Sequence, residues 1–80
     1  MKTPNPLRSA ADERDDVTIA HREYDDGNVV VVDFGPGVEV SVDFLGDLAI
    51  VVAGNRQFEF EMPAGATEVT TNGGLLLIRE

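Results

Sequence analysis

The chain has 80 residues, no cysteine and one histidine, and 15 acidic residues against 6 basic ones give it a net charge of −9. This length allows one small domain, and the lack of cysteine excludes disulfides and thiolate metal sites. Nucleic acid and anionic membranes are disfavoured as partners, because they repel an acidic chain. We see no signal peptide and no apolar stretch long enough to span a bilayer, and therefore expect a cytoplasmic protein.

The basic residues are unusual as well, because Lys2 is the single lysine and the others are arginines. At low salt, so many acidic side chains repel one another and weaken the folded state. At 1 M salt the screening length falls to about 3 Å, and most of this repulsion disappears. The composition therefore predicts a halophilic protein from a salt-rich cytoplasm; the alternative is an ordinary acidic protein with a solvated surface.

Residues 1–16 differ from the rest of the chain. They hold Pro4, Pro6 and a charged run over 12–16, and Leu7 is their one sizeable apolar side chain after Met1. Such a segment buries too little apolar surface to offset the entropy lost on ordering. We predict a flexible acidic tail over 1–16, followed by a folded domain over 17–80. A short helical turn over 9–14, with Ser9 as its cap, is the alternative.

From residue 17 onward, apolar residues alternate with polar ones between turn residues, which is typical of strands. The clearest strand covers 38–44, where Val38, Val40, Val42 and Phe44 are expected to face inward. The apolar run over 29–34 is expected to be buried on both faces of its sheet. The predicted strands cover residues 17–24, 29–34, 38–44, 48–53, 57–62, 67–71 and 75–78.

About seven short strands with no amphipathic helix after residue 16 predict an all-β fold, a compact antiparallel β-sandwich. We expect no cofactor and no small-molecule substrate. The glycine-rich segments 35–37 and 72–74 predict turns, since neither leads into a helix as a phosphate-binding loop does.

Four segments, in order, resemble the core of the small heat-shock protein (Hsp20, or α-crystallin) domain. These are VVDFGPGV at 31–38, LAIVVAG at 48–54, FEFEMP at 58–63 and NGGLLLI at 72–78. The similarity covers about residues 17–79, and the composition suggests a trimmed haloarchaeal member. The resemblance implies a stress-response chaperone or co-chaperone that binds a partner or non-native protein without ATP.

Two departures from that family change the expectation about assembly. Only residues 55–57 separate segment 48–54 from segment 58–63. The family carries a long loop with a dimer-forming strand at this place. The sequence ends at Glu80, without the I-x-I tail that docks on a neighbouring subunit. The alternative function is therefore a small structural or regulatory subunit without chaperone activity, acting through a homodimer or one dedicated partner.

The resemblance also supplies the one candidate binding site. In the family, the groove between the strands matching 38–44 and 67–71 takes up an extended peptide, which places Val40, Val42 and Val69 near it. The alternative is that these valines only fill the core. Strand edges present unpaired backbone groups, so the addition of a peptide strand there is physically natural.

No residues form a recognisable catalytic constellation, and we predict that the chain is not an enzyme. His21 has no Ser or Cys partner at a spacing typical of nucleophilic catalysis. It is expected to be a partly exposed strand residue. Acidic side chains in turns and strands lack the spacing of a calcium-binding loop, so we predict no metal site. The acidic residues considered were Asp25, Asp26, Asp33, Asp43 and Asp47.

Overall fold

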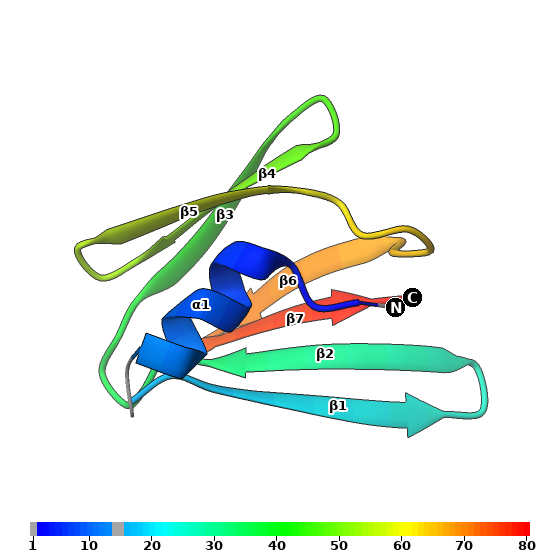
Figure 1. Ribbon diagram of the computed structural model, residues 1–80, viewed down its shortest axis with the longest axis horizontal. Helices are drawn as coiled ribbons and strands as arrows, with labels where there is room; N and C mark the ends of the chain where they lie inside the picture. Colours follow the sequence, from blue (N-terminus) through cyan, green and yellow to red (C-terminus); the bar gives the residue numbers. More distant parts are fainter. Residues whose placement is uncertain (1, 14–15) are drawn as a thin grey trace.

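The structure of the protein is a computed structural model that describes residues 2–13 and 16–80 (Figure 1). Every predicted strand is present, with ends that differ from the expected ones by no more than two residues. The described residues form one helix and seven strands: α1 (Asn5–Glu13), β1 (Thr18–Tyr24), β2 (Gly27–Asp33), β3 (Val40–Leu45), β4 (Leu48–Ala53), β5 (Arg56–Glu61), β6 (Glu68–Asn72) and β7 (Leu75–Arg79).

The strands form two antiparallel sheets, which confirms the predicted all-β sandwich. Sheet A has the order β1-β2-β7-β6, and sheet B has the order β3-β4-β5. The link from β4 to β5 is a tight hairpin whose turn begins at Gly54, where φ is +62°. Glycine adopts this conformation at no steric cost, so no longer loop is needed between these two strands.

The core lies between the two sheets, because alternate side chains of each strand point inward. The rings of Phe34 and Phe58 lie 5.7 Å apart, which joins the end of β2 to β5. The largest fully buried side chains of the strands are Val30, Val32, Val51, Leu76 and Ile78.

The prediction of a flexible tail over residues 1–16 is wrong for residues 5–13, which form helix α1. Leu7 is completely buried and Ala10 nearly so, and α1 contacts β5 and β1. Residues three apart share one face of a helix, so this short apolar face is enough to dock it. The alternative prediction, a helical turn over 9–14, agrees better with α1, although Arg14 lies outside the described residues.

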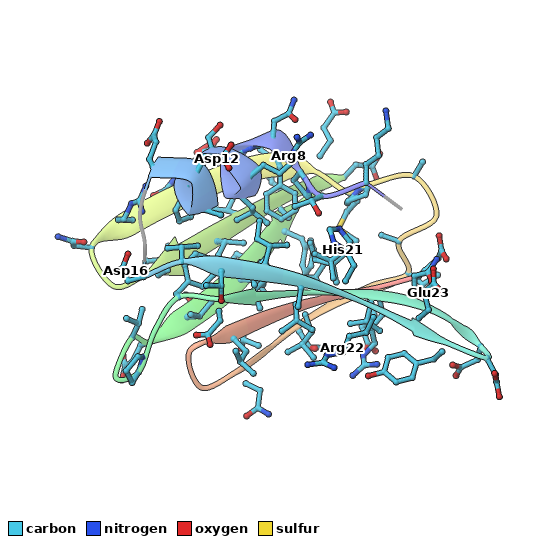
Figure 2. The ribbon with its side chains drawn as sticks, turned by 60° about the horizontal axis from the view of Figure 1, so that its bottom comes forward. Arg8, Asp12, Asp16, His21, Arg22 and Glu23 are labelled. Atoms are coloured by element: carbon cyan, nitrogen blue, oxygen red, sulfur yellow. The ribbon has the colours of Figure 1, made fainter. Side chains whose placement is uncertain are left out.

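Hydrogen bonds fix the start of this helix. The Pro4 carbonyl accepts from the backbone N–H groups of Leu7 and Arg8, both at 3.1 Å. The hydroxyl of Thr3, which is buried, lies 2.8 Å from Nε2 of His21 on β1. Figure 2 shows His21 directed toward the helix side of the sheet. The segment before the helix is therefore attached to sheet A by a side-chain contact.

Helix α1 closes one side of the sandwich and leaves the other uncovered. It contacts β1, an edge of sheet A, and β5, an edge of sheet B, and in Figure 1 it lies in front of the space between the sheets. The opposite edges are β3 and β6, which contact each other. We refer to the side formed by the β3 and β6 edges as the open side.

Candidate partner-binding edge

The backbone of β3 presents hydrogen-bonding groups to the open side. The Gly54 N–H donates to the Glu39 carbonyl at 3.0 Å, which continues the β3–β4 ladder. In an antiparallel ladder every second residue bonds to the neighbouring strand, so the odd-numbered residues of β3 bond to β4. Val40 and Val42 therefore direct their N–H and C=O groups away from β4. Among the described residues, no strand pairs with β3 on that side.

The β6 edge has the same arrangement. Asn72 and Leu75 are in register on either side of the two-residue turn between β6 and β7. The pair that flanks such a turn is hydrogen-bonded, so alternate residues of β6 bond to β7. Val69 and Thr71 then direct their backbone groups to the open side. Two strand edges with outward-pointing donors and acceptors thus lie next to each other.

The structure places the three predicted groove residues on this same side. Val40 and Val42 are half-buried and pack against the core, whereas Val69 is 8% exposed and belongs to the core itself. Val69 can therefore offer a partner its backbone but little of its side chain. A role of these three residues in binding stays a prediction.

Large apolar side chains are exposed where the β3–β4 hairpin ends. Phe44 is 50% exposed and Leu45 71%, both next to the turn, whereas Val52, which is 38% exposed, lies toward the other end of the hairpin. The prediction that Phe44 faces inward is correct for its face, but half of the side chain is exposed. Its register with the buried Ala49 puts it on the inner face, but it lies at the far end of the hairpin. Figure 1 shows the β3–β4 turn standing clear of the other strands.

A shallow hollow of about 460 Å³ lies beside the first half of β3. Its walls combine apolar and polar groups, and Glu39 is the one charged residue among them. Two further acidic side chains, Asp43 on β3 and Glu68 on β6, belong to the strands of the open side. The residues lining the hollow are Val38, Glu39, Val40, Ser41, Val52, Gly54 and Gly73.

The sequence matches, over residues 1–80, a family model described as "Family of unknown function (DUF7127)". The chain belongs to this family. No curated protein and no solved structure matches it. The relationship of this DUF7127 member to the small heat-shock proteins therefore remains a prediction from its sequence.

Other positions in the DUF7127 chain offer less for a functional site. The described residues contain no group of three potential metal-ligating side chains. None of the described helices is long and apolar enough to cross a membrane. The Arg56 guanidinium lies 4.9 Å above the Phe58 ring, and its Nη1 atom is buried without a hydrogen-bond partner. A cation–π contact of this kind stabilises the position of the guanidinium on Phe58.

Proposed function

We propose that this protein is a non-enzymatic interaction module that binds an extended segment of another protein along the open side. The observation that carries the proposal is the asymmetry of the sandwich. Helix α1 contacts the edges of β1 and β5, whereas β3 and β6 lie next to each other as strand edges without a covering element among the described residues. Uncovered strand edges favour the addition of a further strand.

The geometry supports backbone recognition combined with weak side-chain selectivity. An added strand would accept and donate hydrogen bonds at Val40 and Val42, the residues whose backbone groups point outward. The half-buried valines and the exposed Phe44 offer apolar contact to every second side chain of that segment. Glu39 and Asp43 favour basic side chains at the remaining positions. The preferred partner is an extended segment with alternating apolar and basic residues.

The resemblance to small heat-shock domains points to the same side of the sandwich. In that family, the strands matching β3 and β6 form the groove that takes up an extended peptide. We propose chaperone or co-chaperone-type binding without ATP as the role of this edge. This chaperone role requires that the edge binds an extended segment.

The binding step is tested by titrating isotope-labelled protein with a synthetic eight-residue peptide of alternating valine and lysine in about 1 M salt. We expect the largest amide chemical-shift changes at Val40, Val42 and Val69, and small ones along β1, which lies at the opposite edge of sheet A. A peptide with proline in place of valine carries the same charge but cannot form a strand, and serves as the control. Equal shifts with both peptides, or shifts centred on β1, would contradict the proposal.

We also propose that the fold is adapted to high salt, on the basis of the net charge of −9. Screening of the repulsion between acidic side chains is expected to stabilise the fold by about 2 kcal/mol between low and molar sodium chloride, which raises the melting temperature by roughly 8–16 °C. Circular dichroism melts measure this change. A sucrose series of equal osmolality controls for effects other than screening. A melting temperature unaffected by salt would refute the adaptation.

A further inference from the structure

The outer face of sheet A, which points away from the core, is apolar along its two central strands. The outward side chains of β2 and β7 include Val29, Val31, Leu75 and Leu77. Sheets with one solvated face normally alternate apolar and polar residues along each strand. Here the alternation is lost, because β2 and β7 are apolar on both faces over residues 29–32 and 75–78.

Continuous apolar runs are typical of strands that are covered on both faces, which is what the sequence predicted for 29–34. Sheet B packs against the inner face only. Helix α1 packs at the β1 and β5 edges and not over the outer face of sheet A. Among the outward apolar residues Val29 is buried, whereas Val31, Leu75 and Leu77 are half-buried.

The charges on this face form a balanced pattern in an otherwise acidic chain. One row of residues in register crosses the sheet from Arg22 on β1, through Val29 and Arg79, to Glu68 on β6. Figure 2 shows Arg22 directed away from α1, on the side opposite His21. The Arg79 Nε lies 3.4 Å from Oε1 of Glu68. Asp33 lies on the same face, so the charges of two basic and two acidic residues cancel there. A second acidic chain is therefore not repelled by this face.

We propose that this face binds a second copy of the chain in a two-fold symmetric dimer. The two-fold axis lies between the two packed faces, parallel to the strands and midway between β2 and β7. It places β1 of one copy opposite β6 of the other, and β2 of one copy opposite β7 of the other. It places Arg22 opposite Glu68 of the second copy, twice, and Val31 opposite Leu77 of the second copy, also twice. Arginine and glutamate side chains are together long enough to span the roughly 10 Å between packed sheets. The face is therefore complementary to itself in both charge and apolar surface.

The dimer is tested by multi-angle light scattering at 1 M salt over a range of protein concentrations. We expect a mass of about twice the 8.6 kDa of one chain. Leu77→Glu places a charge at the centre of the face and is expected to raise the dissociation constant on the order of 100-fold. Gln57→Glu adds the same charge on sheet B and should leave the mass unchanged. Circular dichroism checks that both variants remain folded.

A charge swap provides the second test. Arg22→Glu should weaken the dimer on the order of 10-fold, and the double variant Arg22→Glu with Glu68→Arg should recover most of that loss. A monomer at all concentrations, a dimer insensitive to Leu77→Glu, or a mass that grows without limit would each overturn the proposal. The two surfaces share β6, but the dimer uses its outward side chain Glu68, whereas peptide binding uses the backbone edge of β3. Failure of the dimer therefore leaves peptide binding at β3 unaffected, and the reverse is also true.

Discussion

Replacing Leu7 with alanine is expected to lower the free energy of unfolding by about 3 kcal/mol. Leu7 is completely buried, and removing a buried leucine side chain costs its burial free energy and leaves a cavity. The loss would detach α1 from β5 and β1 and open the covered side of the sandwich. Equilibrium urea unfolding, followed by circular dichroism at molar salt, measures the change.

The control for this variant is Arg8→Ala, the next residue along the same helix. Arg8 is exposed, and its replacement should change the stability by no more than about 0.5 kcal/mol. Equal small effects of both substitutions would mean that the helix does not dock as described. The comparison thus distinguishes a docked helix from the flexible tail that the composition of residues 1–16 suggests.

Gly74→Ala is expected to destabilise the fold by about 3 kcal/mol. A Cβ atom at this position would lie 2.5 Å from the Gly35 carbonyl oxygen and 3.5 Å from that of Val38. Gly74 also accepts a hydrogen bond from the Phe34 N–H at 2.9 Å, so the clash would push apart two chain segments that must stay in contact. Overpacking against backbone and weakening this bond both lower stability.

The matched control is Gly73→Asn, one residue earlier in the same turn. Gly73 has a φ of +60°, and a Cβ atom there would meet nothing within 4 Å. Asparagine tolerates this backbone conformation better than most residues, so we expect a loss of about 1 kcal/mol. Thermal and urea unfolding measure the loss of stability in both variants. A smaller loss for Gly74→Ala than for Gly73→Asn would contradict the described contact between Gly74 and Gly35.

The strands were predictable because their signals are local. Turn residues, together with alternation or a short apolar run within five to seven positions, mark each strand, and the hairpins follow from the glycines between them. Helix α1 was missed because its docking depends on a non-local fit. The composition of residues 1–16 indicates too little apolar surface to hold a helix in place. Leu7 and Ala10 are nevertheless buried, because α1 contacts β1 and β5, which are distant from each other in the sequence.

The candidate site was predictable only in part. Alternation showed that Val40 and Val42 share a face, but it does not reveal which strands are edges of a sheet. The edge position of β3 and β6 follows from the pairing of all strands and therefore needed the structure. For Phe44, alternation identified the correct face but not its exposure, because burial requires an opposing surface that the end of the β3–β4 hairpin lacks.

Amide hydrogen exchange along β3, measured by NMR with and without the valine–lysine peptide, tests the open edge most directly. The free protein should show alternating protection, slow at Ser41 and Asp43, which bond to β4, and fast at Val42, which points to the open side. The peptide should slow exchange at Val42 and leave β1 unchanged. Slow exchange at Val42 in the free protein, or no change there on saturation with peptide, would contradict the account.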